Sequence, residues 1–169
     1  NIDALLAGKY DAIITNAAGC GSTLKEYDEL LEHDPQYAEK AKDFKSRMKD
    51  INEFLAGLTE NGEFNADMAP LSYKITYQDS CHLAHGQKIK AAPRVLLRLV
   101  PGITFREMPN SDLCCGSAGI YNVVHNEMAM SILERKMESI NLVNPDVIVT
   151  ANPGCMLQLR AGAKMHGRG

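Results

Sequence analysis

The sequence predicts an α/β protein with a mostly parallel sheet and flanking helices, and three observations indicate this fold class. Short apolar segments rich in β-branched residues alternate with longer segments whose apolar residues follow a helical period. Several of the short segments run directly into turns that contain glycine or asparagine, as strands do before a crossover helix. One strand, turn and helix pattern also occurs twice. We therefore expect parallel strands joined by right-handed crossovers and a partial tandem repeat.

Composition narrows the class of protein. The 169 residues, 45% of them hydrophobic, can bury one sizeable core and are too few for two ordinary domains. The net charge is -3, and the sequence contains no run of basic residues that could bind along a phosphate backbone. We therefore expect no nucleic-acid partner. No segment reaches the ~18–20 apolar residues of a membrane span, and the first residues do not form a signal peptide. The five cysteines are odd in number and lack the dense spacing of secreted scaffolds, which favours reduced thiols in a cytoplasmic protein.

The secondary structure is predicted from these patterns. Strands are expected over residues 11–15, 73–78, 102–108 and 146–150. Helices are expected after Ser22, over 93–100 and 117–143, and from about residue 153 onward. Residues 59–70 are polar and rich in turn formers, so we expect a surface loop there.

The most clearly marked helix is predicted over residues 34–58, with Asp34 as its N-cap and Pro35 at its first position. Its apolar residues are spaced alternately by four and three. They are Tyr37, Ala41, Phe44, Met48, Ile51, Leu55 and Leu58. We interpret this stripe as the face that packs on the core of the protein itself, the alternative being a docking surface for another subunit.

An internal repeat links two distant segments. DAIITNAAGCGSTL (11–24) and DVIVTANPGCMLQL (146–159) share Asp, Ile, Thr, Gly, Cys and a final Leu at a constant offset of 135 residues. We predict that residues 1–33 are the tail of a preceding copy, 34–70 a helix and connecting loop, and 71–169 a cysteine-rich domain. The upstream part of the first copy would lie before residue 1, so we expect the sequence to be a piece of a longer protein.

Four cysteines each follow a predicted strand: Cys81, Cys114, Cys115 and Cys155. Because the carboxyl ends of parallel strands share one edge of a sheet, we expect these sulfurs to converge. Three of them also stand close to predicted helix starts, where the thiolate form that binds metal is favoured. The fifth cysteine, Cys20, is interpreted within this sequence as part of the core.

The adjacent pair Cys114 and Cys115 indicates the kind of site. Both side chains can face one centre only if the chain bends, and Gly116 allows that bend. A single zinc ion usually takes cysteines in C-x₂₋₄-C pairs, whereas a cluster of several irons accepts neighbouring sulfurs on different irons. The pair therefore favours an iron-sulfur cluster over zinc. A redox-active disulfide is the other chemical alternative.

These motifs resemble the cysteine-rich CCG domain that is shared by a heterodisulfide reductase subunit, lactate-utilisation iron-sulfur proteins and the glycolate oxidase iron-sulfur subunit. Cys81 is followed after 32 residues by CCG, and Cys115 after 39 residues by Cys155, so the resemblance covers about residues 71–166. The segments CHLAHGQKIKAAPRVLL, LCCGSAGIYN and VTANPGCMLQL are most similar to the glycolate oxidase subunit. Cys20 then corresponds to the closing cysteine of a preceding CCG repeat, and the resemblance implies that it would be a metal ligand together with that upstream repeat.

The resemblance implies an electron-transfer subunit whose cysteines bind an iron-sulfur cluster, of the 4Fe-4S type or a variant, with zinc as the alternative. It implies flavin-containing partner subunits that oxidise glycolate to glyoxylate, a quinone or other carrier as acceptor, and a cytoplasmic protein peripheral to the inner membrane through its partners. The separate sequence is expected to be inactive alone and to contain no catalytic residue. In the heterodisulfide reductase relatives a full motif ends in CxxC and holds a non-cubane iron-sulfur cluster. Here Gln158 stands in place of the last cysteine, which leaves the type of cluster open.

Other polar residues lie near the predicted site. His82 and His85 follow Cys81 and are expected at most to support the ligands, while Asp79 and Asn152 are expected to form hydrogen bonds around them or to cap the backbone. The competing hypothesis, from a different class, is a structural or docking module in which the cysteines hold zinc or remain free thiols.

Overall fold

The computed structural model describes residues 1–167 and contains two parallel sheets. In the smaller sheet β1 (Ile13–Thr15) pairs with β2 (Met48–Asp50). In the larger sheet β3 (Lys74–Gln78) lies between β4 (Thr104–Phe105) and β5 (Val147–Thr150). Every strand pair is parallel, which confirms the predicted α/β class. All four predicted strands are present, although each is shorter than predicted.

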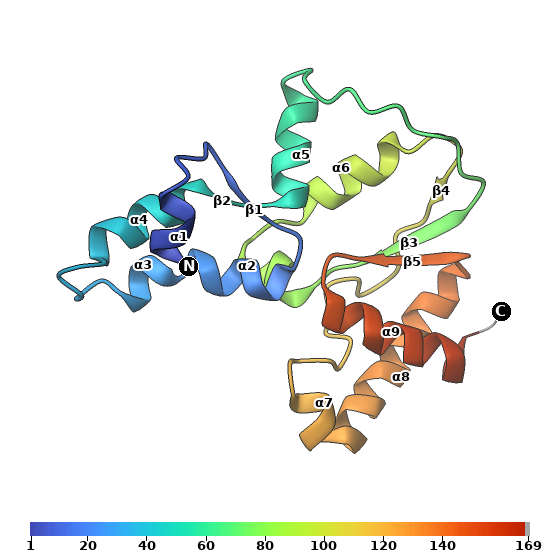
Figure 1. Cartoon of the computed structure of the whole chain (residues 1–169). Helices are drawn as coiled ribbons and strands as arrows, with labels where there is room; N and C mark the ends of the chain where they lie inside the picture. The colour runs from blue at the N-terminus through green and yellow to red at the C-terminus, as the bar shows by residue number, and fades with distance from the viewer. Residues whose placement is uncertain (168–169) are drawn as a thin grey trace.

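Helices cover both faces of the larger sheet. Figure 1 shows α5 (Ile51–Glu60) and α6 (Ala91–Leu99) on one side, and α8 (Asn126–Val143) and α9 (Pro153–His166) on the other. The central strand β3 is buried along most of its length, as expected for a strand covered on both faces. The core beneath α8 and α9 contains apolar residues from both helices and from the loop after β4. They are Met108, Leu133, Met137, Ile140 and Leu159.

The smaller sheet has its own set of helices, seen on the left of Figure 1. They are α1 (Ile2–Leu6), α2 (Ala18–Lys25), α3 (Tyr27–Leu30) and α4 (Ala38–Arg47). A second apolar cluster joins Ile2, Ile13, Phe44 and Met48, and the Phe44 ring stacks on Tyr27 with ring centroids 5.7 Å apart. The molecule therefore has one core for each sheet.

The predicted helix over residues 34–58 is wrong, because the chain straightens into β2 in its middle. Met48 pairs with Ile13 of β1, and Asp50 then starts a new helix with a capping box. The Asp50 carboxylate accepts from the Asn52 amide at 2.9 Å, and the Glu53 carboxylate accepts from the Asp50 amide at 3.4 Å. The spacing of apolar residues continued across the break, so periodicity alone concealed it. The expected stripe is divided between two helices and is not one docking face.

Two other predicted helices are displaced. The helix expected over 117–143 is α7 (Tyr121–Val124) followed by α8, with a break at His125. Residues 117–120 form a turn in which Ala118 and Gly119 have positive φ angles. The helix expected after Ser22 begins earlier, at Ala18, which places Cys20 in its first turn.

The remaining differences lie in a helix end and a loop. Asp34 does accept from the Gln36 and Tyr37 amides at 2.8 and 3.0 Å, but α4 begins only at Ala38. The predicted surface loop is confirmed over 61–70, which contains no helix or strand. Among the described residues, no helix is long and apolar enough to cross a membrane.

Candidate functional site

All five cysteines line one cavity of about 350 Å³ at the carboxyl edge of the strands. Cys81 follows β3, Cys114 and Cys115 lie in the loop between β4 and α7, and Cys155 is the third residue of α9. The structure thus brings together the four cysteines whose convergence was predicted from the parallel sheet. It also places Cys20, the third residue of α2, at the same cavity. The expectation that Cys20 is part of the core is wrong, since Cys20 is exposed and lines the cavity.

Cys81 is held by the end of β3. The residues before it, Gln78, Asp79 and Ser80, are almost completely buried. The Gln78 amide nitrogen donates to the carbonyl oxygens of Asp79 at 2.7 Å and Leu113 at 3.0 Å, so it ties the end of β3 to the residue before the cysteine pair. After Cys81 the chain enters η1, a single π-helical turn over His82–Gly86, a rare element that is often found at functional sites.

Arg94 holds this edge of the larger sheet in place, and no pattern in the sequence marked it as important. Arg94 of α6 donates to both carboxylate oxygens of Asp79, at 2.9 and 2.6 Å, and to Glu107 at 2.8 and 2.6 Å. It also donates to the Ser111 hydroxyl at 3.2 Å, and the Asp79 amide donates to the Ser111 carbonyl at 3.0 Å. Arg94 therefore joins α6, the end of β3 and the loop that leads to the cysteine pair. The two carboxylates hold the pKa of Arg94 above its usual value.

The cysteine pair is bent at Gly116 as predicted. Gly116 has a φ of +91°, and a Cβ at this position would overlap the carbonyl oxygen of Ala129. The Gly116 amide donates to the Cys114 sulfur at 3.3 Å. Only glycine can adopt this backbone conformation in the space available. The bend allows Cys114 and Cys115 to face the same cavity.

Cys155 is positioned by the turn between β5 and α9. Asn152 precedes the helix, and its amide nitrogen donates to the Cys155 sulfur at 3.6 Å. The Cys155 side chain is also buried against the core below α8 and α9, as is that of Cys115. Asn152 thus contributes a hydrogen bond to a sulfur, one of the two roles that the sequence suggested for it.

The thiols affect one another. The Cys115 thiol stabilises the neighbouring thiolates, which lowers the pKa of Cys114 to about 5 and that of Cys155 to about 7. The Gly116 amide adds to the effect on Cys114, and the Asn152 side chain adds to that on Cys155. The pKa of Cys115 is raised by its interactions with Cys114 and Cys155, and burial raises that of Cys81. The thiolate, which is the form that binds metals, is therefore favoured at Cys114 at neutral pH and partly populated at Cys155.

A buried lysine lies behind the pair. Lys136 of α8 is 3% exposed, and its ammonium group donates to the Asn110 carbonyl at 2.5 Å and to the Ser111 carbonyl at 3.5 Å. Burial lowers its pKa, while its interactions with Cys115, Asp112, Asp79 and Cys114 oppose that effect. Its position gave a signal in the sequence, because residue 136 falls on the helix face that carries Leu133, Met137 and Ile140.

The two histidines and Gln158 occupy different places. The His82 Nδ1 atom lies 3.8 Å from the Cys81 sulfur, and His82 lines the cavity. His85 Nε2 instead lies 3.1 Å from the Asp112 carbonyl oxygen. Gln158, which stands where related motifs carry a cysteine, is not among the residues that line the cavity. Its side-chain oxygen accepts from Asn122 at 3.1 Å, so it braces α7, the short helix between the cysteine pair and α8.

The donor set fits an iron-sulfur cluster. The cavity volume of about 350 Å³ is some ten times the ~30 Å³ share of one water molecule, so there is room for a group of several atoms. Hydrogen-bond donors already face the sulfurs of Cys114 and Cys155, and the buried Ser80 hydroxyl has no hydrogen-bond partner among the described residues. Among residues 1–167 no group of three or more cysteine, histidine or acidic side chains is placed so that it could hold a single metal ion.

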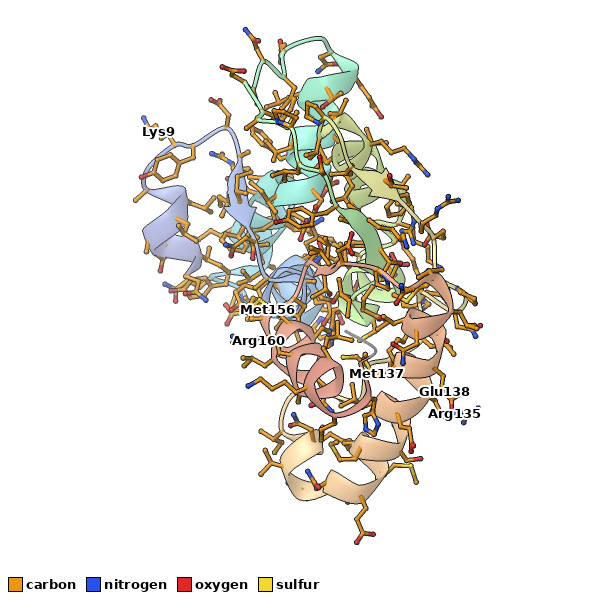
Figure 2. All side chains as sticks on the ribbon, turned by 90° about the vertical axis from the view of Figure 1, so that its right-hand side faces the viewer. Lys9, Arg135, Met137, Glu138, Met156 and Arg160 are labelled. Atoms are coloured by element: carbon orange, nitrogen blue, oxygen red, sulfur yellow. The ribbon has the colours of Figure 1, made fainter. Side chains whose placement is uncertain are left out.

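A larger hollow of about 620 Å³ lies elsewhere, beside α8, α9 and the outer edge of β5. Figure 2 labels Met137, Met156 and Arg160 on its walls, while Arg135 and Glu138 lie on the outer side of α8. No cysteine is among the described residues that line this hollow. The thiol chemistry is therefore confined to the smaller cavity.

Comparisons with known proteins agree with the sequence resemblance. Over 167 residues the chain is 46% identical to the "Probable glycolate oxidase iron-sulfur subunit" of Bacillus subtilis, covering 99% of this chain and 37% of the relative. It is 36% identical over 173 residues to the "Glycolate oxidase iron-sulfur subunit" of Escherichia coli, covering 99% and 41%. It is 37% identical over 161 residues to a subunit of the fumarate reductase (CoM/CoB) of Methanothermobacter marburgensis, covering 95% and 30%.

The chain spans between 30% and 41% of the length of these three relatives. A family model described as "Cysteine-rich domain" matches residues 75–160, about half of the chain. The matched residues run from β3, which leads to Cys81, through the cysteine pair to the middle of α9, beyond Cys155. The chain belongs to the CCG family of cysteine-rich domains.

Proposed function

We propose that Cys81, Cys114, Cys115 and Cys155 bind one iron-sulfur cluster, and that the chain is part of an electron-transfer subunit of a flavin-linked oxidoreductase. The observation that carries this proposal is the convergence of four thiols, from three separate parts of the chain, on one cavity of suitable size. The names of the relatives give independent support, since two of them are iron-sulfur subunits of glycolate oxidases. Four thiolates match the ligand count of a [4Fe-4S] cluster.

Each part of the site has a role in this proposal. A bound cluster accepts and releases electrons. The protein supplies thiolates at Cys114 and Cys155, a hydrogen bond from Gly116 to one sulfur and a hydrogen bond from Asn152 to another. Such hydrogen bonds, together with burial and nearby charge, adjust the reduction potential of a cluster. The buried ammonium group of Lys136 offsets part of the negative charge that the thiolates bring.

The proposed substrate is that of the whole oxidoreductase, and it is suggested by the names of the relatives. We infer that flavin-containing partner subunits oxidise a 2-hydroxy acid, with glycolate converted to glyoxylate, and that electrons pass through this subunit to a quinone or another carrier. The names of the Bacillus subtilis and Escherichia coli relatives support glycolate. The proposed location is the cytoplasm, at the inner face of the membrane through partner subunits. This piece alone is expected to be inactive.

The test uses the natural protein with its partner subunits, prepared without oxygen because open thiolates oxidise readily. Iron, sulfide and zinc are measured together with EPR spectra before and after addition of glycolate. We expect iron and sulfide at the CCG site and a cluster signal that changes when glycolate reduces the complex. Stoichiometric zinc with no EPR signal from this site in any redox state would contradict the cluster. If the cluster is normal but is reduced by lactate and not by glycolate, lactate would replace glycolate as the proposed substrate.

A further inference from the structure

We propose that Cys20 supplies a fifth thiolate to the same metal centre, which would then be a variant iron-sulfur cluster and not a [4Fe-4S] cluster with four thiolates. The centre would then be built from both copies of the repeated strand, turn and helix. This inference rests on the proposed function, because it requires an iron-sulfur cluster in the cavity. It reassigns Cys20, which by its position in the repeat would belong to a separate, preceding site.

The first observation is the shared cavity. Cys20 and Cys155 are each the third residue of a helix, α2 and α9, and both helices begin at the cavity wall. The cavity also has Ala17 and Gly19 of the first copy, and Asn152, Pro153 and Gly154 of the second, in its lining. The turns of the two copies therefore face each other across the same space.

The second observation is a direct link between the two turns. Asn152 accepts a hydrogen bond from the Gly19 amide at 3.2 Å with its side-chain oxygen. The amide nitrogen of the same side chain donates to the Cys155 sulfur at 3.6 Å. The Ala18 amide also donates to the Ala151 carbonyl at 3.2 Å. Asn152 thus fixes the residue next to Cys20 relative to the sulfur of Cys155.

The third observation is the close packing of α2 against η1, the turn that follows Cys81. The Gln87 amide nitrogen donates to the Ala18 carbonyl at 3.0 Å. Gly86 approaches Ser22 so closely that a Cβ on Gly86 would lie 2.6 Å from the Ser22 hydroxyl oxygen. The start of α2 is therefore anchored to the segment of Cys81 as well as to that of Cys155.

The fourth observation concerns the sulfur that the motif lacks. Gln158 stands at the place of the last cysteine, but its side chain contacts Asn122 and lies close to Gly116 instead of lining the cavity. The fifth sulfur at the cavity comes from the other copy of the repeat, at Cys20. A centre with several irons can take sulfur ligands from separate segments, because each cysteine can bind a different iron.

The experiment compares the natural full-length protein in its complex with the Cys20→Ser variant. Thr23→Ala is the control, because its side chain is exposed on the same helix. Each cysteine is alkylated with iodoacetamide before and after removal of iron by a chelator, and the modified peptides are mapped by mass spectrometry. Mössbauer spectra of the protein with iron bound are recorded in parallel. We expect iron to protect all five cysteines, and Cys20→Ser to change the signal of the CCG centre while Thr23→Ala does not.

The outcomes separate the two proposals. Full alkylation of Cys20 while the other four cysteines are protected would overturn the role of Cys20 and leave the proposed function standing. Iron could also protect Cys20 while the Cys20→Ser variant keeps the normal signal of the CCG centre, or loses a different cluster. Either result would overturn the proposed role of Cys20 as well. If iron protects none of the five, the proposed function fails and the role of Cys20 fails with it.

Discussion

The two copies of the repeat, β1 with α2 and β5 with α9, have the same local structure and different surroundings. Each is a short strand, a turn and a helix with cysteine at its third position. β5 joins a three-stranded sheet and Cys155 is 5% exposed, whereas β1 pairs only with the short β2 and Cys20 is exposed. Asn152 before α9 contacts the cysteine sulfur, but the first copy has Ala17 at that position. Local sequence thus sets the shape of the unit, and its neighbours set the chemistry of its sulfur.

The two regions are expected to differ most in how much the loss of one ion pair lowers the free energy of unfolding. Arg94→Met leaves the Asp79 carboxylate buried without its partner, so we expect a loss of about 3–5 kcal/mol in the free energy of unfolding. Lys45→Met removes a more exposed pair with Asp28 in the first region and should cost only about 0.2–1 kcal/mol. Urea denaturation followed by circular dichroism measures both. Equal losses would show that the two regions are equally dependent on their charges.

The second largest effect is expected from a change at the bend of the cysteine pair. Gly116→Ala combines a strained positive φ with an overlap at the Ala129 carbonyl, so we expect a loss of about 2–4 kcal/mol and a large decrease in bound iron. Gly62→Ala is the matched control, because Gly62 also has a positive φ and open space around its Cβ position, and it lies in the surface loop and not among the residues that line the cavity. That variant should lose about 1 kcal/mol and keep its iron. If both variants bound iron normally, the bend would not be needed for the site.

The equivalent glycines of the two turns allow a direct comparison of the copies. A Cβ on Gly154 would lie 2.9 Å from the Ser117 hydroxyl oxygen, whereas a Cβ on Gly19 would meet its nearest atom at 3.5 Å. We expect Gly154→Ala to destabilise the protein by about 1–2 kcal/mol. Gly19→Ala should be neutral or stabilise it by up to about 1 kcal/mol. Thermal unfolding of the two variants checks the sign of each change, and destabilisation by Gly19→Ala would mean that the first turn is as tightly packed as the second.

The smallest expected effect concerns Lys136. Lys136→Met removes a buried positive charge from beside the cysteine pair, so the reduction potential of the proposed cluster should fall. Lys164→Met, on an exposed part of α9, is the control and should leave the potential unchanged. A redox titration followed by EPR measures both potentials. An unchanged potential in Lys136→Met would show that this ammonium group does not influence the cluster.

Much of the site follows from the sequence because it depends on topology. The strands before Cys81 and Cys155 are clear from their β-branched residues, and parallel strands bring their carboxyl ends to one edge. The need for a bend at Gly116 follows from the alternation of side chains along an extended chain. These inferences use only local patterns and one general rule of sheet geometry.

Other features depend on contacts between distant residues, which no local pattern records. Arg94 meets Asp79 only after α6 packs beside β3, and the closeness of Cys20 to the other cysteines depends on the packing of α2 against η1. The break at Met48 was missed because pairing with Ile13 outweighed a continuous helical period. Asp50 and Glu53 did carry a readable signal, since this pair is typical of a capping box.

The central claim is that the CCG cysteines bind one iron-sulfur cluster, and an iron count tests it most directly. Cys81, Cys114, Cys115 and Cys155 are replaced together by serine in the natural full-length protein, which is purified without oxygen beside the wild type. The account predicts that the variant loses the iron, sulfide and EPR signal of one cluster while any other clusters of the protein keep theirs. Equal iron and sulfide contents, with unchanged spectra, in the two proteins would contradict it.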